Sequence, residues 1–375
     1  MLYFNKLLNN LIYAQKESLL RKIILAPLGL LSFFYGWGNS LRVYLYARKV
    51  FPTRSLPCQV VSVGNITSGG TGKTPFVILI GEMLKAKNFR VAILSRGYKG
   101  NFPEPFRLVS DGEQTFMGAS QAGDEPYLLA EKLRGIPVIV GQNRWRSGQY
   151  AIEHFKSEIL ILDDGFQHLP LKRDLNLLLI DSSSPFGNGY LLPRGILREF
   201  PGQLRRADAI ILTKARKYDN IKILKQNLIK VPEKIPIFQV GYEPGEIRML
   251  GKESPLPPEY LKGKKVLAFA GIANPFSFRQ TLLNLNAQIA EFAIFSDHYQ
   301  YRPKEWEKLY QKATDLGVDA LVTTEKDLVR CQGLEQGIIP LWGVSIQHVF
   351  LDNDLPRFEE FLFSRLSLAR RTDFY

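Results

Sequence analysis

Cysteine and histidine are scarce in this chain of 375 residues, which contains two cysteines and four histidines. Cys58 and Cys331 are too few for a disulfide scaffold and too far apart in sequence for a metal-binding knuckle. The apolar content of 45%, with 12% aromatic residues, excludes a disordered or fibrous protein. The length favours two domains, and the cysteine count favours a reducing compartment.

Acidic residues are nearly missing from the N-terminal end, and an apolar run long enough to span a bilayer is missing too. Residues 1–54 hold eight basic side chains against one acidic side chain, a net charge of +7 out of +13 for the chain. The uncharged run Ile23 to Gly38 is shorter than the roughly 20 residues of a transmembrane helix. Pro27 and three glycines weaken a continuous helix there, and the run begins too late for a cleaved signal.

This combination favours an N-terminal arm that associates with the membrane interface, where apolar bulk enters the headgroup region and lysine and arginine meet anionic lipid. The alternative is a helical arm that packs on its own domain. The positive charge lies beside an apolar segment rather than on a helix suited to reading bases, so no nucleic-acid partner is expected.

Short apolar runs alternate with helical stretches along most of the chain. Near-continuous apolar strands are typical of a parallel sheet that helices cover on both faces. The sequence therefore predicts an α/β fold. The expected strands of the first domain are 59–63, 90–94, 137–140, 158–162, 175–180, 209–212 and 237–240.

The predicted domain organisation has four parts. The arm occupies residues 1–54, and a P-loop domain with a mostly parallel sheet occupies 55–240. Residues 241–264 contain four prolines and read as a linker or domain crossing. A smaller α/β domain, residues 265–375, closes over the active site; its expected strands are 265–270, 291–295 and 320–324, and its expected helices lie near 276–285 and 303–316.

A glycine-rich loop between the first strand and a helix carries the sharpest motif, GNITSGGTGKTP from Gly64 to Pro75. Backbone N–H groups in such a loop cradle phosphates, a lysine reaches the β- and γ-phosphates, and a hydroxyl binds Mg²⁺. Thr67 stands where the strict motif has glycine. The predicted ATP-binding residues are Thr67, Ser68, Gly69, Gly70, Thr71, Gly72, Lys73 and Thr74.

A pair of aspartates, Asp163 and Asp164, follows the apolar strand 158–162. Together with Thr74, one of them is expected to contact Mg²⁺, as in other P-loop proteins. The sequence leaves open which aspartate does so, and capping of the next element is the alternative.

Further charged residues follow other predicted strands or precede a helix, at the edge where α/β sheets bind ligands. Solvent-exposed charges with no role are the alternative for each of them. The candidates are Arg96, Asp124, Glu125, Arg144, Arg198, Glu199 and His298.

Taken together, the motifs resemble the tetraacyldisaccharide 4'-kinases of lipid A biosynthesis. The P-loop, SRGY, GDEP, DDGFQH, LPRGILRE, SDH and TTEKD occur in the family's order over roughly residues 25–345. Two positions depart from the pattern: Arg194 stands where the family often has a small residue, and Phe200 stands where proline is common.

The resemblance implies transfer of the γ-phosphoryl group of ATP to the 4'-hydroxyl of a tetraacyldisaccharide 1-phosphate, giving lipid IVA. Asp124 would accept the hydroxyl proton, with His298 as its partner. Lys73 and Mg²⁺ would stabilise charge on the transferred group. Residues 324–327 would lie near the nucleotide. Acceptor contacts would come from Arg96, Arg144, Arg198 and Glu199.

The resemblance also implies a location and partners. The lipid substrate stays in the bilayer, so the enzyme is expected at the cytoplasmic face of the bacterial inner membrane, as a peripheral or monotopic protein that acts as a monomer. The competing hypothesis is a membrane-associated P-loop nucleotide switch, which GGTGKT also fits. Such a switch would not need the GDEP and SDH motifs.

Overall fold

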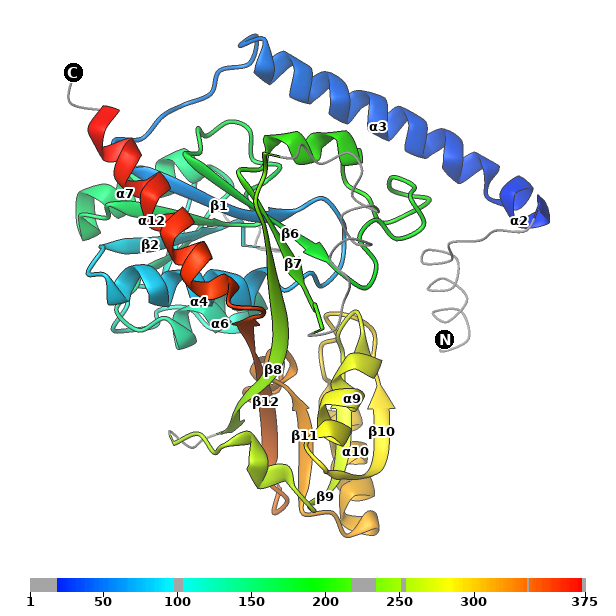
Figure 1. Cartoon of the computed structure of the whole chain (residues 1–375). Coiled ribbons are helices and arrows are strands. Elements are labelled where there is room, and N and C mark those ends of the chain that lie inside the picture. The colour runs from blue at the N-terminus through cyan, green and yellow to red at the C-terminus, as the bar shows by residue number, and fades with distance from the viewer. Residues whose placement is uncertain (1–18, 98–103, 217–233, 251–253, 336, 373–375) are drawn as a thin grey trace.

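A computed structural model describes residues 19–97, 104–216, 234–250, 254–335 and 337–372 (Figure 1). Within these residues, twelve strands form one sheet in the order β10-β9-β11-β12-β8-β7-β6-β1-β5-β2-β4-β3. All neighbouring strands are parallel except β3 with β4 and β12 with β8. The predicted mostly parallel α/β architecture is confirmed.

The P-loop half is built on seven strands and the helices between them. The strands are β1 (Gln59–Asn65), β2 (Val91–Ser95), β3 (Arg107–Ser110), β4 (Val138–Val140), β5 (Ile159–Asp163), β6 (Leu175–Asp181) and β7 (Ala209–Thr213). The helices are α4 (Lys73–Ala86), α5 (Ala119–Ala122), α6 (Asp124–Lys132), α7 (Arg144–Phe155) and the short η1 (Pro201–Arg206).

Helices cover both faces of this half, as the apolar strands require. One core packs side chains of α4 and α6, such as Phe76 and Leu129, on β1 and its neighbours. On the other face α7 packs on β2 and β5, and residues 191–207 pack on β6 and β7. Because the parallel strands end at one edge, the loops after β1, β2, β5 and β7 come together there.

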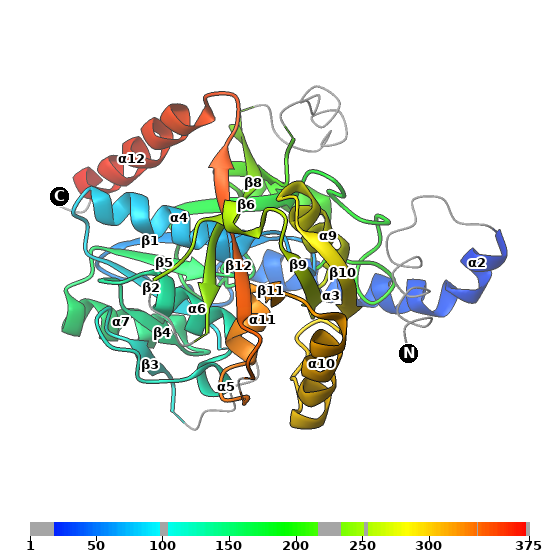
Figure 2. The same cartoon turned by 90° about the horizontal axis from the view of Figure 1, so that it is seen from below.

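The second half contains β9 (Lys265–Ala270), α9 (Pro275–Asn284), β10 (Gln288–Ile294), α10 (Pro303–Leu316), β11 (Ala320–Thr324) and α11 (Glu325–Arg330). The short η2 (Pro258–Leu261) precedes it. Helix α9 covers one face of its strands, while α10 and α11 cover the other. Figure 2 shows α11 between this half and α6 of the P-loop half.

Two long antiparallel strands join the halves. Strand β8 (Ile237–Met249) pairs with β7 through its first residues and with β12 (Leu341–Phe350) through the rest. The expected linker 241–264 therefore begins inside a strand, which continues past Pro244 because β12 supplies a partner. A break in the pairing register between Val344 and Ile346 lies opposite this proline.

The last helix, α12 (Asp354–Thr372), leaves the second half and packs on the first. Phe358 contacts Phe76 of α4 and Phe238 of β8, with ring centroids 5.9 and 5.1 Å apart. Figure 2 shows α12 beside α4. The C-terminal part of the expected 265–375 domain thus completes the core of the P-loop half.

The N-terminal arm contains α2 (Leu19–Ile24) and α3 (Ala26–Ala47); its first 18 residues lie outside the described part. Helix α3 is continuous, although the sequence suggested a weakened helix, because Pro27 occupies its first turn and two of its glycines face the protein body. None of the described helices has the length and apolar character of a membrane span. Figure 1 shows α3 along the P-loop half, remote from the second half.

Candidate active site

The P-loop connects β1 to α4, as the sequence predicted. Its first residues are held by a neighbouring loop, since Thr67 bridges to Leu197 and the Ser68 N–H donates to the Ile196 carbonyl over 2.7 Å. Further along, the Thr213 hydroxyl at the end of β7 donates to the Thr71 carbonyl over 2.9 Å. Thr74 is buried in the first turn of α4. These contacts hold the P-loop between the loop that contains Ile196 and the end of β7.

Gly72 ends this loop with φ of 81°, a left-handed conformation that favours glycine. The aromatic rings of Tyr242 and His348, a register pair of β8 and β12, stack on each other and pack against it. A Cβ at this position would lie 2.1 Å from Tyr242 Oη and 2.8 Å from His348 Nε2. The junction strands thus shape the P-loop.

The aspartate pair lies beside the P-loop, where Asp163 at the end of β5 pairs in register with Val63 of β1. Asp163 is fully buried, and its Oδ2 accepts a hydrogen bond from Ser95 over 3.2 Å. Burial and the nearby carboxylates of Glu125 and Asp164 raise the pKa of Asp163 to about 6.

The pKa of Asp164 is shifted in the opposite direction from that of Asp163. Asp164 Oδ1 lies 3.5 Å from Lys73 Nζ, and Arg198 donates to both carboxylate oxygens over 3.0 and 2.8 Å. Burial opposes ionisation, but Lys73 and Arg198 outweigh it and lower the pKa of Asp164 to about 2. This carboxylate is therefore ionised at neutral pH and paired with the P-loop lysine.

The residues present fit an Mg²⁺ ion bound together with phosphates. The buried Oδ1 of Asp163 accepts no hydrogen bond from the described residues, which is a costly state unless a cation or water binds it. No cluster of three His, Cys, Asp or Glu suited to a metal occurs in the described part of the chain. Mg²⁺ commonly takes one or two carboxylates plus substrate phosphates and waters, so Asp163, Asp164 and Thr74 would suffice.

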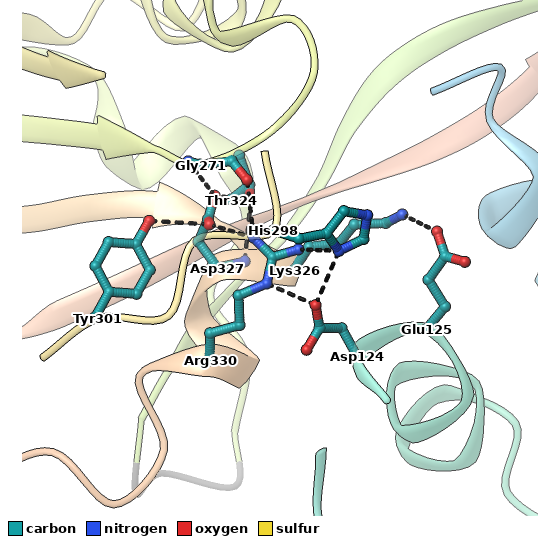
Figure 3. Close-up of polar contacts among 9 residues, drawn as sticks. All are labelled: Asp124, Glu125, Gly271, His298, Tyr301, Thr324, Lys326, Asp327 and Arg330. Carbon is teal, nitrogen blue, oxygen red and sulfur yellow. Dashed lines mark hydrogen bonds and ion pairs between the residues drawn. The ribbon is translucent and has the colours of Figure 1, made fainter. Parts of the chain in front are cut away.

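Asp124 and His298 meet across the two halves of the molecule (Figure 3). Asp124 begins α6, where its charge suits the helix N-terminus, and His298 follows β10 with φ of 56°. His298 Nδ1 lies 3.3 Å from Asp124 Oδ2. Two residues 174 positions apart, predicted to act together, are in contact.

The neighbouring residue Glu125 makes a second link, to Lys326 of α11, with Oε1 and Nζ 2.5 Å apart. The charges of Lys326 and, more weakly, Lys73 hold the pKa of Glu125 at about 2 against the effect of burial. Because Glu125 interacts electrostatically with both Lys73 and Asp164, the start of α6 lies close to the phosphate-binding site.

The expected acceptor-contact residues fall into different environments. Arg198 pairs with Asp164 at the site, and Arg144 is buried, donating to the Asp163 backbone carbonyl over 2.9 Å. Burial lowers the pKa of Arg144 to about 10. Glu199 is also buried and pairs with Arg206. Arg96 is exposed after β2, and Tyr98 of the same motif lies outside the described residues.

One further residue of this site was not predicted from the sequence. Arg330, the last residue of α11, contacts both Asp124 and His298. Its signal was weak, because it follows the TTEKD motif by three positions and no local pattern marks it. Only its spacing of i+3 from Asp327 on one helical turn relates it to that motif.

The glycine-rich loop, its lysine, the buried aspartate at the adjacent strand end and the carboxylate across the site define a P-loop phosphotransferase. The family model for tetraacyldisaccharide-1-P 4'-kinase (LpxK) matches residues 22–367. The chain belongs to this family.

Individual relatives agree. The chain is 41% identical over 324 residues to the tetraacyldisaccharide 4'-kinase of Syntrophus aciditrophicus, covering 84% of this chain and 87% of that protein. It is 40% identical to that of Desulfatibacillum aliphaticivorans, covering 92% and 93%. A crystal structure of LpxK from Aquifex aeolicus in complex with ATP superposes with a TM-score of 0.71 at 32% identity, covering 92% of this chain and 99% of that one.

Proposed function

We propose that this chain transfers the γ-phosphoryl group of ATP to the 4'-hydroxyl of a tetraacyldisaccharide 1-phosphate, with Asp124 as the general base. The observation that carries this proposal is the contact between Asp124 and His298 beside the P-loop. A nucleotide switch that hydrolyses ATP needs no such pair brought from two halves of the fold. Membership of the kinase family supports the same reading.

The residues divide the chemistry between them. The P-loop amides and Lys73 bind the phosphates and stabilise charge on the transferred group, and binding of the nucleotide competes with Asp164 for Lys73. Asp124 accepts the proton of the acceptor hydroxyl as that oxygen attacks phosphorus. Mg²⁺, held by Thr74 and one of the two aspartates, would neutralise charge between the β- and γ-phosphates.

One chain supplies every residue of this proposed site, since Asp124 comes from the P-loop half and His298 from the second half of the same molecule. A monomer is therefore sufficient for activity. Contacts across the halves, including Lys326 to Glu125, hold the site together without a second subunit.

A transfer assay tests the proposal. Wild type is incubated with labelled ATP, Mg²⁺ and tetraacyldisaccharide 1-phosphate in mixed micelles, beside Asp124→Asn and the control Asp315→Asn, which alters an exposed aspartate of α10. We expect labelled lipid from wild type and control, and a fall of about 10²- to 10⁴-fold for Asp124→Asn. Wild type that hydrolyses ATP without labelling lipid would refute the kinase reading and favour the switch.

We also propose that the arm docks the enzyme on the membrane. One side of α3 faces the protein body: Ser32 donates to the Leu191 carbonyl over 2.8 Å, and Gly36 lies against Leu191 and Phe200. Outside these contacts, α2 and α3 carry large apolar side chains that are 37 to 67% exposed. These are Ile23, Ile24, Leu28, Leu30, Leu31, Phe33, Phe34, Tyr35, Trp37 and Leu41.

The arm is also connected to the site, which suits a substrate whose acyl chains stay in the bilayer. Asn39 donates to the Arg198 carbonyl over 2.8 Å, and Arg198 in turn pairs with Asp164. An apolar face of this size on a monomer marks an interaction surface, and the basic charge of the arm favours anionic lipid. The location proposed is the cytoplasmic face of the bacterial inner membrane, as a peripheral or monotopic protein.

Vesicle flotation tests the arm. Phe33→Glu combined with Phe34→Glu alters only exposed positions, so the contacts of Ser32 and Asn39 remain; Phe276→Glu in α9, 67% exposed, is the matched control. The double variant should lose most of its binding to vesicles that contain anionic lipid, whereas the control should bind like wild type. Equal binding of all three proteins would contradict the docking proposal.

A further inference from the structure

Arg330 contacts both Asp124, the proposed base, and its partner His298. The Arg330 side chain is 1% exposed, and its guanidinium makes four contacts (Figure 3). Nε donates to Asp124 Oδ2 over 2.7 Å, and Nη2 lies 3.2 Å from His298 Nδ1. Nη1 donates to the Gly271 carbonyl and to Asp327 Oδ1, each over 2.8 Å.

The contacts behind the guanidinium hold it in place. Asp327 is fully buried and accepts hydrogen bonds from Tyr301 over 2.9 Å, from Thr324 over 2.7 Å and from the Gly271 N–H over 3.0 Å. Asp327 keeps these three hydrogen-bond donors when Arg330 is replaced, but its buried carboxylate loses its ion-pair partner, which destabilises the protein. Arg330 is thus a rigid fork presented by the second half to the P-loop half.

A guanidinium can only donate, and this fixes the chemistry of its neighbours. His298 Nδ1 can accept from Arg330 only when that nitrogen carries no proton, so Arg330 favours the tautomer protonated on Nε2. On Asp124, Arg330 Nε donates to Oδ2, and His298 Nδ1 lies 3.3 Å from the same oxygen without donating to it in this tautomer. Oδ1 is therefore the oxygen left to receive the proton of the acceptor.

We propose that Arg330 is a positioning residue for phosphoryl transfer: its fork fixes the orientation of Asp124 and holds His298 as the Nε2-protonated tautomer. The inference rests on the proposed role of Asp124 as base. It explains why a buried arginine spans the two halves at this point, where a lysine could satisfy only one of the two partners at a time.

The charge of Arg330 affects the pKa of Asp124, so the pH dependence of the rate is a second test of the proposal. The groups that face Asp124 are Arg330 and His298 from the second half and Glu125 on its own helix; Lys326 pairs with Glu125, and Asp327 backs Arg330. Burial acts to raise the pKa of Asp124, but the neighbouring charge of Arg330, whose Nε lies 2.7 Å from Oδ2, helps to lower it below the ordinary value. Loss of the arginine should therefore raise this pKa, and the acid limb of the rate profile should move to higher pH.

Nitrogen-15 NMR of histidine-labelled protein tests the tautomer directly, because the chain has only four histidines and His298→Gln identifies the signal. Wild type should show an unprotonated Nδ1 that accepts a hydrogen bond, and Arg330→Gln should move the proton to Nδ1, where it bonds Asp124. A proton on Nδ1 in wild type would overturn the inference, as would an unchanged tautomer in Arg330→Gln.

Kinetics complete the test, with Arg330→Lys as the conservative variant and Arg90→Gln, in an exposed ion pair with Glu158, as the control. Arg330→Gln should lower kcat about 10²-fold with KM for ATP little changed, and should shift the acid limb upward. Arg330→Lys should keep the acid limb but recover only part of kcat. If Arg330→Gln and Arg330→Lys both kept the kcat and the pH profile of wild type, the inference would be refuted.

Failure of the proposed function and failure of the positioning role of Arg330 give different experimental results. Wild type that never labels lipid would refute the proposed function, while the NMR comparison would still decide whether Arg330 sets the His298 tautomer. Wild type that labels lipid, together with an Arg330→Gln variant whose tautomer and pH profile are unchanged, would refute only the positioning role. Thermal unfolding of each variant excludes loss of the fold as the cause.

Discussion

Replacing Gly72 by alanine should destabilise the P-loop even without nucleotide. The residue has φ of 81°, and an added Cβ would lie 2.1 Å from Tyr242 Oη and 2.8 Å from His348 Nε2. The clash involves the buried side chain of His348 and the half-buried side chain of Tyr242, whose rings stack on each other, so an added Cβ must displace at least one of the two rings.

The magnitude follows from two separate terms. An L-residue in the left-handed region costs about 1 to 2 kcal/mol relative to glycine. Overpacking a well-packed site costs about 1 to 3 kcal/mol more. Gly72→Ala should therefore lower the free energy of unfolding by about 2 to 5 kcal/mol, a large fraction of the stability of a typical protein.

Urea unfolding of the nucleotide-free protein measures this effect, with Gly70→Ala as the matched control. Gly70 lies in the same loop, but a Cβ there would meet no atom within 4 Å, so the control should change stability by less than about 1 kcal/mol. Adding Tyr242→Phe to Gly72→Ala removes the closest clash and should restore part of the packing term. Equal stability of the two alanine variants would refute the reasoning.

Three further variants probe the site. Asp163→Asn should raise the Mg²⁺ concentration for half-maximal transfer about 10- to 100-fold, because it alters the buried oxygen with no partner among the described residues; an unchanged Mg²⁺ titration would contradict this. Thr213→Val leaves the Thr71 carbonyl without its donor and should cost about 1 to 3 kcal/mol in urea unfolding; wild-type stability would count against that contact. Lys326→Met removes the cation that lowers the pKa of Glu125 to about 2. The loss of unfolding free energy relative to wild type should be complete above about pH 4.5 and should shrink as the pH falls toward 2. A loss that does not change with pH would contradict this prediction.

Local patterns in the sequence were sufficient for much of the fold. Most of the predicted strands are near-continuous apolar runs that lie within a few residues of the expected position, but the strand expected at 237–240 continues to Met249 as β8. The two that were missed have partners that the sequence does not reveal. Strand β3 is a short antiparallel edge strand, and β12 pairs antiparallel with β8 at the junction of the two halves.

In the candidate site, too, local sequence predicted some residues, whereas the environment of others depends on distant contacts. Lys73, Thr74 and the aspartate pair were predictable because a strand, a loop and a helix in direct succession place them. Glu199 was a substrate-contact candidate because it lies in a charge-rich loop, and its pairing with Arg206 in a buried position could not be read from the sequence. The membrane role of the arm stays a prediction.

By itself, the sequence determined the elements and the family, because apolar periodicity and the P-loop act over neighbouring residues. Only the tertiary structure decided which distant residues meet. Arg330 lies 206 positions from Asp124, and α12 returns from the chain's end to pack on α4. Such contacts depend on the crossing of β8 and β12 between the halves, a pairing that no local pattern encodes.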